Sequence, residues 1–196
     1  MTIDPCSKGW LSVPGLRPKG DRTLAEQMMG LAPALALARG KSVLDLGCAE
    51  GLIALEFARA GATRVLGVEL LSSHLEVARE VCKGQAGMEF RCAHLDDYVK
   101  AHPQPEVFDI VLALGIIHKL PSPKVPLDFA ARSARTLLCF RAPAAATDGV
   151  VFSKHTDIGV NVPKTLRGHG FREGETIPGV RGEAVQYWWR DVKEAA

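Results

Sequence analysis

The sequence has little net charge and no long apolar run. Its 24 lysines and arginines are nearly balanced by 22 aspartates and glutamates, which leaves a formal net charge of +2. A partner selected mainly by bulk charge, such as duplex nucleic acid, therefore gains little support. No stretch approaches the roughly 20 consecutive apolar residues of a membrane-spanning helix. Residues 1–10 lack an apolar core flanked by basic residues, so we predict neither a secretory signal nor a membrane partner.

Cysteine is also sparse, and its positions match no metal or disulfide framework. The five cysteines are an odd number and include no C-x-x-C pair, which disfavours both a zinc knuckle and a disulfide scaffold. No spacing among the six histidines matches a metal site. This cysteine usage is typical of a reducing compartment. We therefore predict a cytoplasmic protein without a bound metal.

The chain does contain enough apolar sequence for one well-buried core. With 196 residues and a hydrophobic share of 47%, it has the composition of a globular protein rather than of a disordered one. We predict an N-terminal arm over residues 1–22, followed by one domain over residues 23–196. The sequence does not indicate the oligomeric state.

Glycines, prolines and apolar periodicity predict that strands and helices alternate along this domain. Strands are expected over residues 41–47, 64–70, 88–92, 107–114, 136–140, 171–177 and 184–190. Helices are expected over residues 21–39, 51–60, 73–83, 96–102, 127–135 and 155–170. Because parallel strands need crossover connections, we predict an α/β fold of three layers, with a doubly wound and mostly parallel sheet between two layers of helices.

Three positions carry finer expectations about the helices. Thr23 with Glu26, and Ser73 with Glu76, have the spacing of a capping box, in which two side chains satisfy the first backbone N–H groups of a helix. Pro33 interrupts the first helical pattern and is expected to kink or split that helix.

The most informative stretch is a strand that runs into a glycine turn and then a helix, Val43-Leu-Asp-Leu-Gly-Cys-Ala-Glu-Gly51. Glycine removes the Cβ that would block a ligand, and the unpaired N–H groups of a helix start suit a carboxylate or phosphate. Asp45 lies near the strand end, where it can hold an ammonium or position a water. Cys48 lies next to the helix start, which lowers the pKa of a reactive thiol, although packing within the turn is the favoured interpretation.

A second acidic residue follows the next predicted strand. Glu69 ends this strand, and a carboxylate at that place can accept hydrogen bonds from both hydroxyls of a ribose. A dinucleotide fingerprint requires G-x-G-x-x-G, but Ala49 and Leu52 occupy the positions of its second and third glycines. The pattern therefore favours a nucleoside whose charged tail is an amino acid over a pyrophosphate.

Together these residues resemble a known family. The stretch from Val43 to Gly51 looks like the first motif of class I S-adenosylmethionine-dependent methyltransferases, and Glu69 matches the acidic ribose-binding residue of that family. The stretch Phe108-Asp-Ile-Val-Leu-Ala-Leu-Gly-Ile-Ile-His118 is similar to its fourth-strand motif. The resemblance covers roughly residues 20–140. It implies a Rossmann-like sheet of seven strands with the last strand reversed, S-adenosylmethionine as cofactor, and methyl transfer as activity.

Carried over to this chain, the resemblance implies a set of cofactor-binding residues that runs from the arm to the fourth strand. The set comprises Lys19, Arg22, Asp45, Gly47, Cys48, Ala49, Gly51, Glu69, Leu70, His94, Leu95, Leu114 and Gly115. Within it, the turn residues would line the methionine moiety, residues 69–70 and 94–95 the ribose and adenine, and residues 114–115 the sulfonium. The two arm cations would reach the cofactor's carboxylate. His94 departs from the acidic residue usual in the family, for which Asp96 is the alternative.

His118 is the catalytic hypothesis. Methyl transfer from a sulfonium is an in-line displacement, so positioning is most of what the protein supplies, and a hydroxyl or protonated amine acceptor also needs a base. His118 lies just past the fourth predicted strand, at the edge of the sheet where ligands bind in such folds. A hydrogen-bonded loop or helix-cap histidine is the alternative interpretation.

The identity of the acceptor is left open by the sequence. A small molecule is the first hypothesis, because no N-P-P-Y-like motif and no appended nucleic-acid module is found. An RNA base is the alternative, based on five cations from Lys119 to Arg141 that have only Asp128 as a counter-charge within that segment, although ordinary solvated surface is the favoured interpretation of these cations. A non-catalytic binding protein and an NAD-binding Rossmann-like protein remain further alternatives.

Overall fold

The structure is a computed structural model that describes residues 9–144, 146 and 148–191, so residues 1–8 of the predicted arm, with Cys6, lie outside it. The chain divides into two compact units, with the boundary after Leu95. The prediction of a single domain after the arm is not tested by this division and stays a prediction.

The first unit contains two sets of parallel strands. The short strands β1 and β2 of the arm pair in parallel, and so do the longer strands β3, β4 and β5. The strands are β1 (Gly9–Leu11), β2 (Gly20–Arg22), β3 (Ser42–Leu46), β4 (Arg64–Glu69) and β5 (Met88–Cys92). The helices are α1 (Leu24–Met28), α2 (Ala32–Ala36), α3 (Leu52–Arg59) and α4 (Ser72–Val81). Because β3 and β4 are buried along most of their length, their apolar runs explain why these segments form central strands.

Two of the three expectations about helices in this unit are confirmed. The Thr23 hydroxyl accepts the Glu26 N–H at 3.2 Å while the Glu26 carboxylate accepts the Thr23 N–H at 2.7 Å, which is the predicted capping box. The first helix is split, and Pro33 lies in the first turn of α2, where its missing N–H costs nothing. The second capping box is wrong, because α4 begins at Ser72 with no side-chain cap and thereby includes Ser73 in its first turn.

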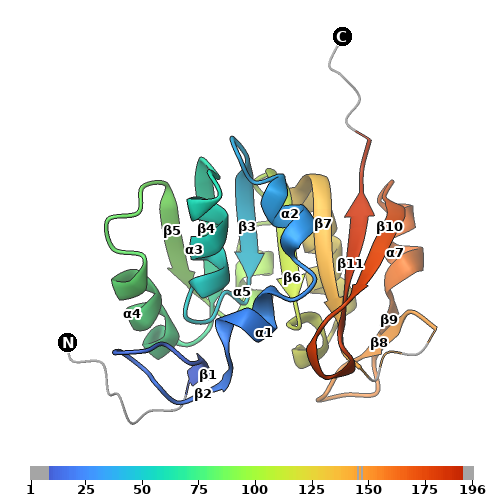
Figure 1. Ribbon diagram of the computed structural model, residues 1–196. Helices are drawn as coiled ribbons and strands as arrows, with labels where there is room; N and C mark the ends of the chain where they lie inside the picture. The colour runs from blue at the N-terminus through green and yellow to red at the C-terminus, as the bar shows by residue number, and fades with distance from the viewer. Residues whose placement is uncertain (1–8, 145, 147, 192–196) are drawn as a thin grey trace. The chain divides into compact units, whose positions relative to one another are not determined.

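The second unit contains four further strands of the sheet and a hairpin. Strands β6 and β7 are parallel, and β11 is antiparallel to both β7 and β10. The strands are β6 (Phe108–Leu114), β7 (Ala134–Ala142), β8 (Val150–Phe152), β9 (Gly159–Asn161), β10 (Arg172–Pro178) and β11 (Ala184–Trp189). The helices are α5 (Leu95–Ala101), η1 (Ile117–Lys119), α6 (Lys124–Ser133), α7 (Val162–Gly168) and η2 (Val180–Gly182). In Figure 1 the arrow of β11 runs opposite to that of β7.

The seven strands of the sheet have the order β10-β11-β7-β6-β3-β4-β5. Strands β3 to β5 are parallel to one another, β6 is parallel to β7, and the last strand is reversed. The predicted α/β fold class, with a mostly parallel seven-stranded sheet, is therefore confirmed. In β11 the side chains of Tyr187 and Trp188 are both buried, because this strand has a neighbour on each side and is covered on both faces.

The helix predicted over residues 155–170 is wrong. Residues 150–161 contain the antiparallel pair β8 and β9, and only Val162–Gly168 is helical. The helix begins late because the Asn161 side chain accepts the Lys164 N–H at 2.8 Å, which caps the helix there. Gly159 lies under the Phe152 ring, where a Cβ would come within 2.9 Å of the ring, so this glycine serves the hairpin.

Candidate functional site

The glycine turn that follows β3 has an unusual backbone. Gly47, Ala49 and Gly51 have φ angles of 79°, 47° and 71°, all in the left-handed region. The N–H groups of Gly47 and Cys48 both donate to the Val68 carbonyl, at 2.8 and 3.2 Å, which ties the turn to β4. A left-handed φ is easy for glycine but costs a residue with a Cβ about 1–2 kcal/mol. Ala49 therefore holds a conformation in which glycine is usual.

Gly51 has a reason to be glycine that does not involve a ligand. A Cβ at this position would lie 2.9 Å from the Ala78 Cβ of α4 and 3.1 Å from the Phe90 ring of β5. The neighbouring strand shows the same crowding, because a Cβ at Gly67 would lie 2.6 Å from the Cys48 sulfur. Packing against α4 and β5 thus accounts for Gly51, and its contact with a cofactor stays a prediction.

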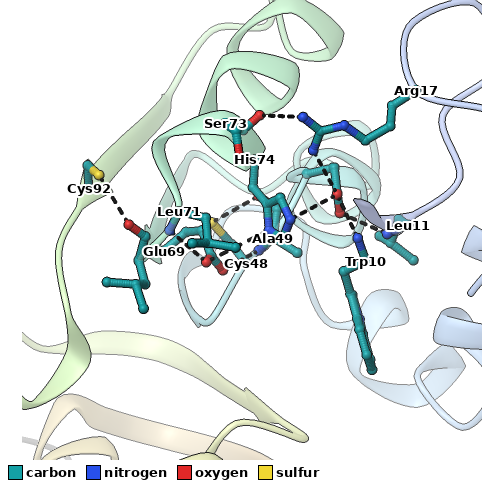
Figure 2. Close-up of polar contacts among 12 residues, drawn as sticks. Trp10, Leu11, Arg17, Cys48, Ala49, Glu69, Leu71, Ser73, His74 and Cys92 are labelled. Carbon is teal, nitrogen blue, oxygen red and sulfur yellow. Dashed lines mark hydrogen bonds and ion pairs between the residues drawn. The ribbon is translucent and has the colours of Figure 1, made fainter. Parts of the chain in front are cut away.

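The structure brings the Glu69 carboxylate to the glycine turn. At the end of β4, Glu69 Oε2 accepts the Ala49 N–H at 3.0 Å, and Oε1 accepts the Leu71 N–H at 3.0 Å (Figure 2). The side chain is 12% exposed, so the carboxylate borders solvent. Because each carboxylate oxygen has two lone pairs, Glu69 can accept further hydrogen bonds from ligand hydroxyls. One hydrogen bond therefore joins the glycine turn after β3 to the acidic residue at the end of β4.

Cys48 in this turn is not set up as a nucleophile. Burial raises the pKa of its thiol well above the usual value, and the nearby carboxylates of Asp45 and Glu69 raise it further. The hypothesis that the helix start lowers this pKa is wrong, because burial and two negative charges oppose the helix dipole. Asp45 itself is buried at the end of β3.

The residues predicted to contact the adenine lie around the ends of β4 and β5. Leu70 is 52% exposed, which is unusual for a leucine next to buried strand residues, and its carbonyl accepts the Cys92 thiol at 3.5 Å. The Ala93 N–H donates to the Glu69 carbonyl at 2.9 Å, which places His94 and the buried Leu95 just after this contact. An exposed apolar side chain beside Glu69 suits a flat ring, and the roles of these residues stay predictions.

The arm cation that contacts the glycine turn is Arg17, which is not one of the two that the sequence suggested for the cofactor's carboxylate. Lys19 is exposed, and the buried Arg22 lies with its guanidinium 5.6 Å from the centre of the Trp10 ring. It is Arg17 that contacts the turn, with Nη1 3.4 Å from Glu50 Oε1, while its Nη2 donates to the Ser73 carbonyl at 3.1 Å. The proposed contact of Lys19 or Arg22 with a cofactor carboxylate stays a prediction.

Glu50, Arg17 and His74 are site residues that sequence reasoning missed. The Glu50 side chain is fully buried and accepts the N–H groups of Trp10 and Leu11, both at 2.9 Å, in addition to the Arg17 contact. His74 Nε2 lies 3.5 Å from Glu50 Oε1 (Figure 2). Glu50 belongs to the glycine-turn motif, but nothing in that motif indicates that its side chain is buried. For Arg17 and His74, no local pattern marks the contact.

In the second unit, the end of β6 leads through Gly115 into the short helix η1, which contains His118. Leu114 is half-buried, and Gly115 has a φ of 70° with space where a Cβ would be. His118 is buried, and its carbonyl accepts the Lys154 N–H at 2.8 Å. Burial lowers the pKa of His118 to about 4, and the positive charges of Lys154 and Lys119 add to this effect. The ring is therefore neutral at pH 7, able to accept a proton but only a weak base.

This shift predicts a pH dependence of stability. Between pH 6.5 and 4 the unfolded chain binds a proton at His118 and the folded chain does not, so the free energy of unfolding falls as the pH is lowered through this window. Between pH 7 and 5 the loss from this group should be about 1–2 kcal/mol. We expect His118→Gln to remove this contribution to the pH dependence of the free energy of unfolding, as measured by urea unfolding of both proteins at the two pH values. Equal pH dependence in the two proteins would contradict the buried neutral ring.

Of the five cations between Lys119 and Arg141, three have a partner in the fold and one is buried. Arg135 pairs with Asp109 at 3.0 Å, Arg132 donates to the Pro103 carbonyl at 2.6 Å, and Lys124 pairs with Asp128. Arg141 is buried. The interpretation of Asp128 as their one counter-charge is thus wrong, because the fold supplies partners from other segments. The RNA alternative, which depended on these cations, is not favoured.

Residues 9–144, 146 and 148–191 lack two features that would point to other functions. Within those residues, no three histidine, cysteine or acidic side chains are grouped as a metal site would require. The same residues include no helix whose length and apolar character would let it cross a membrane.

Comparison with known proteins agrees with this geometry. A family model described as "Methyltransferase domain" matches residues 43–138, about half of the chain. The ubiquinone biosynthesis O-methyltransferase of Neisseria meningitidis serogroup C is 36% identical over 87 residues, which cover 43% of this chain and 36% of that protein. The chain thus spans little more than a third of the length of this relative.

Solved structures are similar over more of the chain. Magnesium protoporphyrin IX methyltransferase from Synechocystis PCC 6803, solved with bound SAM, covers 82% of this chain and 78% of its own with a TM-score of 0.62 at 20% identity. The N-terminal domain of EvdMO1, solved in the presence of SAH and D-fucose, covers 92% of this chain and 89% of its own with a TM-score of 0.64 at 20% identity. At these identities the similarity shows the fold.

The fold, the position of Glu69 beside the glycine turn and the family match agree. Residues 43–138 belong to the methyltransferase-domain family, which confirms the predicted resemblance to class I S-adenosylmethionine-dependent methyltransferases.

Proposed function

We propose that this protein is an S-adenosylmethionine-dependent methyltransferase that acts on a small molecule. The observation that carries the proposal is the hydrogen bond between Glu69 Oε2 and the Ala49 N–H, because it joins the two sequence motifs into one polar corner. The family match over residues 43–138 supports the same class of reaction. The small-molecule acceptor is supported by the relatives, whose names refer to ubiquinone biosynthesis and to magnesium protoporphyrin IX.

The residues around the glycine turn fit such a cofactor. Glu69 keeps lone pairs for ribose hydroxyls, and Leu70 offers an exposed apolar side chain for the adenine. The start of α3 directs a positive dipole end toward the turn, which suits the cofactor's carboxylate. When bound, the cofactor supplies a methyl group on a sulfonium, which needs no metal or covalent intermediate.

The chain's own contribution to the reaction is then mainly positioning. Glu69 orients the nucleoside, and the turn from Gly47 to Gly51 places the amino-acid tail. His118 is our candidate base for a hydroxyl or amine acceptor; it is neutral at pH 7, and its lowered pKa of about 4 makes it a weak base in the absence of ligands. Holding the acceptor atom about 3 Å from the methyl group provides most of the rate enhancement in a displacement of this kind.

We place the protein in the cytoplasm. This proposal is supported by its cysteines, because the four within the described residues, Cys48, Cys82, Cys92 and Cys139, are all free thiols. A reducing compartment keeps such thiols unpaired.

Two experiments test this function against its alternatives. Calorimetric titration of the full-length protein with S-adenosylhomocysteine and with NAD should give binding of the former only, and tight binding of NAD alone would reject the proposal. Incubation of cell extract with the enzyme and methyl-labelled donor should then label the small-molecule fraction. Label in RNA would support the RNA alternative, and absence of label together with tight donor binding would indicate a non-catalytic protein.

A further inference from the structure

His74 lies between two carboxylates that belong to different parts of the first unit. Its Nε2 is 3.5 Å from Glu50 Oε1, and its Nδ1 is 3.8 Å from Glu69 Oε1 (Figure 2). The ring is 12% exposed, and it comes from the first turn of α4. One side chain therefore contacts both the carboxylate that holds the arm and the carboxylate that borders the glycine turn.

Glu50, the first of these carboxylates, binds the arm. Glu50 accepts the backbone N–H groups of Trp10 and Leu11 in β1 and contacts the Arg17 guanidinium. A fully buried carboxylate is stable only when its partners surround it. Arm, turn and α4 are thus joined at Glu50, since Arg17 also donates to the Ser73 carbonyl of α4.

Glu69, the second carboxylate, is held by two backbone amides and has the His74 ring beside it. The Ala49 N–H holds Oε2, the Leu71 N–H holds Oε1, and the His74 ring faces Oε1. The two amides fix the oxygens along the backbone, whereas the His74 ring stands against the side of the carboxylate. Among the described residues, His74 Nδ1 is buried and has no hydrogen-bond partner. The Glu69 carboxylate is the charged group that it faces, at 3.8 Å.

We propose that His74 is a positioning residue that orients Glu69 for the ribose hydroxyls and couples that orientation to the docked N-terminal arm through Glu50. The inference rests on the proposed function, because it assigns to Glu69 the ribose of the methyl donor. His74 itself need not touch the ligand. Loss of its ring leaves Glu69 Oε1 with the Leu71 N–H alone and removes the polar link to Glu50.

The test separates positioning from general structural support by using the ligand's own hydroxyls. Affinities of wild type and His74→Ala are measured by calorimetry for S-adenosylhomocysteine and for its analogue that lacks both ribose hydroxyls. We expect His74→Ala to weaken binding of the first ligand about tenfold and of the second less than twofold, because the analogue has no hydroxyl for Glu69 to bind. His155→Ala, at an exposed histidine of the second unit, is the matched control and should change neither affinity.

The outcomes are distinguishable. Equal losses for both ligands, or no loss for either, would overturn the role of His74 while leaving the methyltransferase proposal in place. Failure of the wild-type protein to bind S-adenosylhomocysteine would instead reject the proposed function and this inference with it. If His74→Ala does not fold, as judged by thermal unfolding, the same comparison is made with His74→Leu, which fills a similar volume without a polar group and should show the same difference between the two ligands.

Discussion

Glu50→Ala should lower the free energy of unfolding by about 3–5 kcal/mol, the usual result of removing one partner from a buried ion pair. The change strips the acceptor from two backbone N–H groups of β1 and leaves Arg17, whose side chain is 3% exposed, without its carboxylate. Urea unfolding followed by circular dichroism measures the loss.

Two further variants show whether the lost charge or the lost shape of Glu50 causes this fall in the free energy of unfolding. Glu50→Gln keeps an oxygen that can accept one amide and should be less damaging than Glu50→Ala. In the double variant Arg17→Met with Glu50→Gln, no unpaired charge remains. Its loss in the free energy of unfolding should therefore be smaller than the sum of the losses of the two single variants. A loss of under about 1 kcal/mol for Glu50→Ala would show that the arm can detach and rehydrate these groups, and would contradict a docked arm.

Glu69→Ala should weaken binding of S-adenosylhomocysteine by about 1–3 kcal/mol, or roughly five- to 150-fold. The carboxylate is a charged acceptor bordering solvent, and it also holds the Ala49 and Leu71 N–H groups that shape the turn. Calorimetric titration measures the change, and activity at low donor concentration should fall by a similar factor.

The controls for Glu69 address charge and location. Glu69→Gln preserves size and one acceptor oxygen, so it should lose less affinity than the alanine variant. Glu80→Ala removes a carboxylate on the exposed face of α4, where Glu80 pairs with Lys83, and should leave the affinity unchanged. Unchanged affinity in a folded Glu69→Ala protein would count directly against the assignment of this residue to the ribose.

Sequence patterns predicted the seven strands of the large sheet well, but they missed the short strands β1, β2, β8 and β9 and placed some helix ends poorly, for a physical reason. An apolar run such as that of β6 has to be buried whatever surrounds it, so its burial follows from composition. A capping pattern is weaker evidence. Thr23 and Glu26 form the capping box, but Ser73 and Glu76 have the same spacing and do not, because α4 starts at Ser72 and buries Leu75. Tertiary packing decided between two equal local signals.

In the candidate site too, one contact could be predicted from the sequence and another could not. The order of strand, glycine turn and second strand is sufficient to predict that Glu69 lies beside the turn, since neighbouring parallel strands end at one edge of the sheet. By contrast, no sequence pattern singled out Arg17 as the cation of the arm that contacts Glu50 in the turn. Arg17, Lys19 and Arg22 are equivalent in sequence, and only the path of the arm separates them.

The sequence alone thus determined the fold class, the family and the position of the acidic residue after β4, because each depends on local apolar patterns and on the order of elements. Only the tertiary structure decided how Glu50 is neutralised and what His74 contacts. Glu50 is 39 residues from Leu11 and 33 from Arg17 along the chain. Contacts across such separations depend on where the arm returns to the sheet, which no local pattern of residues encodes.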